Sequence, residues 1–117
     1  MKHILSIIIL IVITVINGPS LFAQSKKQEV IIKTKIYCDH CAKCETCKAR
    51  VEGKVYELKG VQQVEMNPTN ETIRVVFNPK RMSVETIKTQ INKSGYDADE
   101  MKASEKEIAE LDGCCRK

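Results

Sequence analysis

Hydrophobic and polar side chains alternate along three stretches of the chain. Residues 30–36, 61–66 and 72–77 mostly follow this period of two, which is the pattern of a strand that buries one face. A fourth, short strand is expected to begin at Tyr96, directly after Gly95. The sequence therefore predicts four strands that share one hydrophobic side.

Two stretches between these strands have apolar residues at helical spacing. In residues 45–58, Cys47, Val51, Val55 and Leu58 recur on one side, as in a helix that packs against a sheet. This spacing leaves Lys48, Glu52 and Lys54 for solvent.

The second helix follows Ser83, a residue type that caps helices. It should carry Val84, Ile87 and Ile91 inward and end at Gly95. The order of elements is βαββαβ, which predicts a ferredoxin-like α+β fold. In this fold, two helices cover one face of a four-stranded antiparallel sheet.

A short third helix is expected in the C-terminal tail. Ser104 and Glu107 have the spacing of a capping box, and they precede the apolar residues Ile108 and Leu111. This helix should span residues 105–111 and end close to a terminal pair of cysteines. We expect the domain itself to cover residues 24–102 and the helical tail to cover 103–117.

The first 23 residues have the composition of a secretory signal peptide. Three residues with a basic Lys2 precede an almost wholly apolar run, 4–16, and Ala23 stands before a polar segment. This order favours cleavage near Ala23 and a periplasmic or secreted mature protein. The alternative is an uncleaved membrane anchor. The apolar run is short for that role, because a spanning helix needs about 20 residues.

The charge of the chain is weakly positive, with a formal net charge of +4 that is spread along the sequence. The sequence has no basic run with interleaved aromatic side chains, so it carries no nucleic-acid signature. No Ser/His/Asp set or pair of carboxylates suggests catalysis, and we expect a protein that is not an enzyme.

All six cysteines follow the predicted leader, and four of them lie within ten residues. Disulfides are the default expectation for an exported protein with an even number of cysteines. Cysteines so close in sequence, however, would close only short loops and stabilise little. Clustered thiolates suit a soft metal ion better. The cluster comprises Cys38, Cys41, Cys44 and Cys47, and the remaining two are Cys114 and Cys115.

Cys44 and Cys47 are favoured as the primary pair of metal ligands because they lie at the start of the first predicted helix. Cys44 precedes the first predicted helix, and Cys47 lies in its first turn. Unpaired backbone N–H groups and the positive end of the helix dipole stabilise a thiolate there. Lys43 and Lys48 add positive charge nearby.

The additional pair, Cys38 and Cys41, leaves the coordination number open. Two sulfurs suit linear Cu(I) or Hg(II), whereas four sulfurs suit tetrahedral Zn(II) or Cd(II), or a small Cu(I)–thiolate cluster. His40 is a further candidate ligand, although an exposed loop residue is the simpler interpretation.

The stretch from about 28 to 101 resembles the heavy-metal-associated domains. This family includes copper chaperones, mercury-binding periplasmic proteins and the N-terminal modules of metal-pumping ATPases. The residues that carry the resemblance are Cys44-x-x-Cys47 followed by Arg50-Val51-Glu52, Leu58-x-Gly60-Val61, and Gly95-Tyr96-Asp97-Ala98.

The resemblance implies a βαββαβ fold with Cys44 and Cys47 as the two metal ligands. It also implies handover of the ion, by exchange of thiolates, to a metal-transporting membrane protein or another metal-binding domain. Tyr96 matches an aromatic residue that packs beside the metal loop in many bacterial members. The chain departs from the family in its added cysteine pair and in lacking Gly-Met shortly before Cys44.

Three other functions fit parts of the cysteine pattern. A Cys-x-x-Cys pair at a helix start is also typical of thiol–disulfide oxidoreductases, but no strand–helix unit resembles a thioredoxin. An iron–sulfur protein would need different spacing and a following Cys-Pro. The third alternative is a small domain whose cysteines are simply oxidised in pairs.

The terminal pair, Cys114 and Cys115, is within reach of the predicted site. A helix of seven residues spans about 10 Å, and a strand of about five residues spans roughly 16 Å. The tail could therefore bring these sulfurs to Cys44 and Cys47 as extra ligands or as a relay. The alternative is a flexible tail, as is common at chain termini.

Overall fold

The computed structural model describes residues 26–37, 45–111 and 113–115, with only the backbone of Cys114. The predicted leader and the candidate ligands Cys38, His40, Cys41 and Cys44 lie outside the described residues. Among the described residues, no helix is both long and apolar enough to cross a membrane. The elements in chain order are β1 (Gln28–Lys33), α2 (Glu45–Tyr56), β2 (Val61–Asn67), β3 (Thr72–Phe77), α3 (Val84–Lys93), α4 (Glu105–Ala109) and the 3₁₀ turn η1 (Gly113–Cys115).

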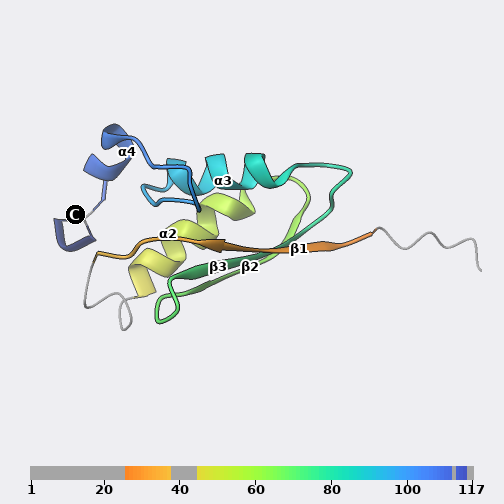
Figure 1. The fold of residues 1–117 in the computed structure, drawn as a ribbon, viewed down its shortest axis with the longest axis horizontal. Coiled ribbons are helices and arrows are strands. Elements are labelled where there is room, and N and C mark those ends of the chain that lie inside the picture. Colours follow the sequence, from red (N-terminus) through yellow and green to blue (C-terminus); the bar gives the residue numbers. More distant parts are fainter. Residues whose placement is uncertain (1–25, 38–44, 112, 116–117) are drawn as a thin grey trace, which may run out of the picture.

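The described strands form one antiparallel sheet in the order β1-β3-β2. Central strand β3 places Ile73 and Val75 on the buried face, opposite Met66 and Val64 of β2, while Ile32 of β1 lies opposite Ile73. Helices α2 and α3 lie on one face of this sheet (Figure 1). This arrangement confirms the predicted α+β layering.

The core fills the space between the two helices and the sheet. Helix α2 contributes Val51 and Val55, and α3 contributes Ile87 and Ile91, all fully buried. These are the positions that the helical spacing predicted. Burying a side chain of this size stabilises the fold by about 1.5–3 kcal/mol, so the apolar face of each helix holds it on the sheet.

The predicted fourth strand is not formed as a strand in the described part of the chain. A tight turn takes its place, in which Ala98 pairs with Met101. Asp99 adopts a positive φ of 52°, which is incompatible with an extended strand. The turn meets β1 at Lys33, where the Asp99 N–H donates to the Lys33 carbonyl oxygen at 2.7 Å and the Asp99 carboxylate accepts from the Lys33 N–H at 2.8 Å.

Lys88 of α3 anchors this turn to the helix. Its ammonium lies 3.1 Å from the Asp99 carboxylate and 3.0 Å from that of Glu100. Hydrogen bonds to Glu100 and then Asp99 raise the pKa of Lys88. The pKa of Glu100 is lowered, mainly by a hydrogen bond from its own backbone N–H and then by Lys88. The turn therefore has a fixed place beside β1 without a continuous strand.

Side chains of α2 accept hydrogen bonds from backbone N–H groups along the outer edge of β2. The Met66 N–H donates to the Glu52 carboxylate at 3.0 Å, and the Val64 N–H donates to the Tyr56 hydroxyl at 3.1 Å. An edge strand otherwise presents unpaired backbone groups. The helical pattern predicted Glu52 to face solvent only, so this role of its carboxylate is a correction.

The residues that cap α3 and α4 are those that the sequence predicted. The Ser83 hydroxyl accepts from the Thr86 N–H at 3.3 Å at the start of α3. The predicted capping box of α4 is present, with both the Ser104 and the Glu107 side chains accepting a backbone N–H. Helix α4 ends at Ala109, two residues earlier than predicted, and the chain then continues to η1.

Candidate metal centre at the start of helix α2

Cys47 lies in the first turn of α2 and points into the protein. Only 1% of its surface is exposed, and it belongs to the same buried cluster as Val51 one turn later. Its position in the helix agrees with the sequence prediction. The core-facing stripe of the helix fixes this direction, because Cys47, Val51 and Val55 share one face.

The chain that leads into the cysteine segment is held by Glu71. The Thr34 N–H donates to the Glu71 carbonyl oxygen at 2.9 Å, and the Ile36 N–H donates to the Glu71 carboxylate at 3.1 Å. These bonds carry the chain beyond the end of β1, although the strand itself is shorter than predicted. Tyr37, directly before Cys38, is the last described residue on this side.

The structure brings a second sulfur to Cys47 from the far end of the chain. Cys115 of η1 is 6% exposed, and its Sγ lies 3.2 Å from the Cys47 Sγ. This separation is well above the roughly 2.05 Å of a disulfide bond. Cys115 thus lies within the reach that the lengths of the predicted elements allowed. Figure 1 shows the blue C-terminal segment η1 at the same end of the domain as the start of α2.

Leu111 docks the tail onto the domain. Its side chain is 3% exposed and lies directly over Gly95. A Cβ added at Gly95 would lie 2.8 Å from Leu111 Cγ, and the glycine also has a positive φ of 96°. Only glycine combines this backbone conformation with such close packing. The sequence pattern at Gly95 indicates only the end of a helix and gives no sign of its contact with the tail.

The segment between Gly95 and α4 is tied down by polar contacts. The Asn92 amide donates to the carbonyl oxygens of Tyr96 and Met101, at 2.9 and 3.1 Å. The Asp97 carboxylate accepts from the Ala103 N–H at 3.0 Å and pairs with Lys102 at 3.1 Å. The course of the chain toward Cys115 is therefore fixed at several points.

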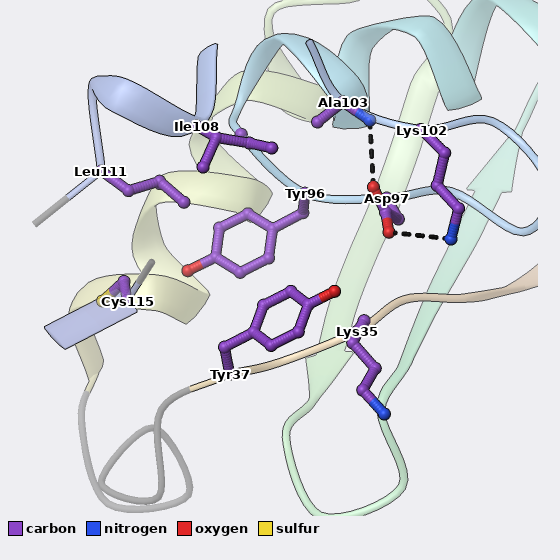
Figure 2. A pocket seen from close by; sticks show the side chains of 10 residues that line it. Lys35, Tyr37, Tyr96, Asp97, Lys102, Ala103, Ile108, Leu111 and Cys115 are labelled. Atoms are coloured by element: carbon purple, nitrogen blue, oxygen red, sulfur yellow. Dashed lines mark hydrogen bonds and ion pairs between the residues drawn. The ribbon is translucent and has the colours of Figure 1, made fainter. Parts of the chain in front are cut away.

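A cavity of about 190 Å³ opens beside Cys115. Figure 2 shows the Tyr96 ring between Ile108 and Tyr37, with the Leu111 side chain directed toward it. Tyr96 is 3% exposed, which agrees with the packing that the sequence resemblance implied. Aromatic and aliphatic walls limit the access of water to the neighbouring sulfur. The lining residues are Lys35, Tyr37, Gly95, Tyr96, Asp97, Lys102, Ala103, Ile108, Leu111 and Cys115.

Sequence reasoning missed Tyr37 and Lys35 as part of this cavity. Both immediately precede the cysteine segment, and their closeness to Cys38 in sequence was the available signal. Within the described ranges, no three His, Cys, Asp or Glu side chains converge as a complete metal site. The described part of the centre therefore consists of two close sulfurs in a largely apolar setting. Such a pair can bind a soft ion or join as a disulfide.

Comparison with known proteins identifies the family. Residues 30–97 match the heavy-metal-associated domain. A segment of 70 residues, which makes up 60% of this chain, is 36% identical in sequence to part of copper-transporting ATPase 1 of Mus musculus. The matched part is 4% of that protein's length. A segment of 61 residues, which makes up 52% of the chain, is 34% identical in sequence to part of a zinc-transporting ATPase of Synechocystis sp.. The matched part is 8% of that protein's length. The chain thus spans less than a tenth of the length of these curated relatives.

A solved structure extends the likeness to three dimensions. The N-terminal domain of a potential copper-translocating P-type ATPase from Bacillus subtilis, in the Cu(I)-loaded state, superimposes with a TM-score of 0.54 and 26% identity. The alignment covers 63% of this chain and 86% of that one. With the family match over more than half its length, this chain belongs to the heavy-metal-associated domain family.

Proposed function

We propose that this protein carries a soft metal ion, bound by cysteine thiolates at the start of α2 and passed on by ligand exchange. The observation that carries the proposal is Cys47, buried in the first helical turn with a second sulfur 3.2 Å away. Membership of the heavy-metal-associated family supports the same chemistry. Cys44 is the proposed partner of Cys47, since it lies three residues earlier at the helix start.

The environment of Cys47 suits a thiolate–metal bond. The N-terminal end of a helix favours negative charge, so it stabilises the thiolate that a soft ion requires. Burial keeps water away from the bond and slows loss of the ion to solvent. Cys38 and Cys41, which precede this pair in the same segment, are proposed as auxiliary ligands.

Cu(I) is the proposed principal cargo. Thiolate ligands select soft ions, and two or three sulfurs satisfy Cu(I) or Hg(II), whereas Zn(II) favours four ligands. Two relatives support copper, because one is a copper-transporting ATPase and another was solved with Cu(I) bound. The zinc-transporting relative supports Zn(II) as a weaker alternative.

The proposed acceptor is a metal-transporting membrane protein or another metal-binding domain. The matched segments of the curated relatives are small parts of transporters, so a domain of the same kind is a natural docking partner. An incoming cysteine thiolate would bond to the ion as one of this protein's thiolates leaves. The ion would then never be released to water.

Thiol–disulfide exchange fits the described geometry less well. Cys47 and Cys115 are 1% and 6% exposed, and a redox catalyst needs an accessible sulfur to attack its substrate disulfide. The two buried sulfurs are better placed to hold an ion than to turn over a protein substrate.

Metal selection is the first test. The reduced protein, residues 24–117, is incubated without oxygen in an equimolar mixture of Cu(I), Zn(II) and Cd(II), then desalted and analysed for metals. We expect copper to be retained in clear excess, because the soft thiolates favour it. Hg(II) added afterwards should displace copper. Retention of zinc alone, or of no metal, would contradict the proposal.

We also propose that residues 1–23 direct export and are removed near Ala23. The basic start and the apolar run 4–16 support this. N-terminal sequencing of the protein purified from its source should read from about Gln24. Recovery of intact Met1 in a membrane fraction would instead indicate an anchored protein.

A further inference from the structure

We propose that Cys115 is a ligand of the same ion as Cys47, so that the docked tail completes the metal site. This inference rests on the proposed function and goes beyond it, because the ligand comes from outside residues 30–97, which define the family match. It assigns the tail the role of a removable part of the metal centre.

The distance between the two sulfurs is the first argument. Cys47 and Cys115 are 68 residues apart in sequence, yet their Sγ atoms lie 3.2 Å apart. With metal–sulfur bonds of about 2.3 Å, two thiolates on one ion are roughly 3.8 Å apart at the tetrahedral angle and roughly 4.0 Å apart at the trigonal angle of a three-coordinate ion. An increase of about 0.6–0.8 Å, through rotation of the two side chains, would admit an ion between the two sulfurs.

The second argument is that the tail is held in place by specific contacts. The capping box of Ser104 and Glu107 fixes the start of α4. Leu111 then packs on Gly95 so closely that a Cβ there would clash with it. The cap and this contact together give the tail a defined place on the domain.

The surroundings of Cys115 give the third argument. Its sulfur borders the cavity of about 190 Å³ whose walls include Tyr96 and Leu111, as seen in Figure 2. The aromatic and aliphatic walls limit the access of water to a bond between this sulfur and an ion.

A ligand on a detachable tail suits a carrier. With the tail docked, the additional sulfur retains the ion. During handover, an incoming thiolate forms its bond to the ion as the bond to Cys115 breaks, and the released thiolate takes a proton from solvent. The oxidation state of the ion does not change, and the departure of η1 exposes the ion to the acceptor.

The inference is tested by counting the sulfur ligands of the bound ion in the wild type and in two matched variants, Cys115→Ser and Cys114→Ser. X-ray absorption of the Cu(I)-loaded, reduced protein gives the number of sulfur ligands, and competition with a chromophoric chelator gives the affinity. We expect Cys115→Ser to have one sulfur fewer than the wild type. Its affinity should fall at least about tenfold, since even outer-shell changes typically cost 10–100-fold. Cys114→Ser, the adjacent tail cysteine, should match the wild type.

A further variant separates ligation from folding. Leu111→Ala keeps Cys115 but loosens the tail, so its affinity should fall between those of the wild type and Cys115→Ser. Circular dichroism should show that each variant remains folded. Equal sulfur numbers and affinities in the wild type and Cys115→Ser would overturn the inference, as would loss of the sulfur in Cys114→Ser instead. Failure of the wild type to bind any ion would overturn the proposed function as well.

Discussion

Replacing Cys44 and Cys47 together with serine is expected to abolish tight binding of Cu(I). A structural Zn(II) site with four ligands has an apparent binding free energy of roughly 10–16 kcal/mol, or about 3 kcal/mol for each ligand. Loss of two thiolates should then cost roughly 6 kcal/mol, which is about four orders of magnitude in affinity. The effect is measured by competition for Cu(I) against a chelator of known affinity.

The matched control removes the same number of thiols from the same segment. Cys38→Ser with Cys41→Ser should lower the affinity or the stoichiometry but retain binding, because the helix-start pair remains. Cys47 is 1% exposed, so a buried hydroxyl at this position will also destabilise the fold somewhat. Thermal unfolding of both double variants identifies that contribution. If the Cys38/Cys41 variant loses all metal and the Cys44/Cys47 variant keeps it, the ligand assignment is wrong.

Gly95→Ala is expected to destabilise the domain by roughly 2–5 kcal/mol. A residue with a side chain pays about 1–2 kcal/mol for a left-handed backbone, and Gly95 has a φ of 96°. Its new methyl group would also lie 2.8 Å from Leu111 Cγ and 3.0 Å from the Glu107 carbonyl oxygen. Overpacking of this kind typically costs 1–3 kcal/mol. Denaturant unfolding of the metal-free, reduced protein measures the loss.

The same substitution at Gly53 is the control for Gly95→Ala. Gly53 lies inside α2, and a Cβ added there would meet no atom within 4 Å. Gly53→Ala should therefore stabilise the protein by about 0.5–1 kcal/mol, through the higher helix propensity of alanine. Because Gly95→Ala displaces the tail, it should also weaken Cu(I) binding, whereas Gly53→Ala should not. A Gly95→Ala protein as stable as the wild type would refute the docking role assigned to this glycine.

Local patterns were sufficient to predict most of the fold. Strand β3 spans the predicted residues, and Val51, Val55 and Ile91 are buried as the helical spacing requires. The capping box of α4 also follows from a few neighbouring residues. In each case the determining interaction is local, or it depends only on which side of an element faces the core.

Features that depend on contacts between distant residues were harder to predict. The extended pattern after Gly95 indicated a fourth strand, but the bonds between Asp99 and Lys33 favour a turn. The charge of Glu52 indicated that its side chain faces solvent, whereas its carboxylate accepts a hydrogen bond from a backbone N–H at the open edge of β2. The lengths of the predicted helix and strand showed that Cys115 could reach Cys47. The contact between Leu111 and Gly95, which brings the tail to that place, has no signal in the sequence pattern.

Transfer of the ion to an acceptor tests the carrier function most directly. Cu(I)-loaded protein is mixed with a metal-free cysteine-pair domain of a copper-transporting ATPase, in the presence of a chelator that captures any released Cu(I). Copper in each component is measured over time after rapid separation. We expect copper to pass to the acceptor domain while the chelator remains nearly empty. Copper that accumulates on the chelator first, or that never leaves this protein, would contradict the carrier function.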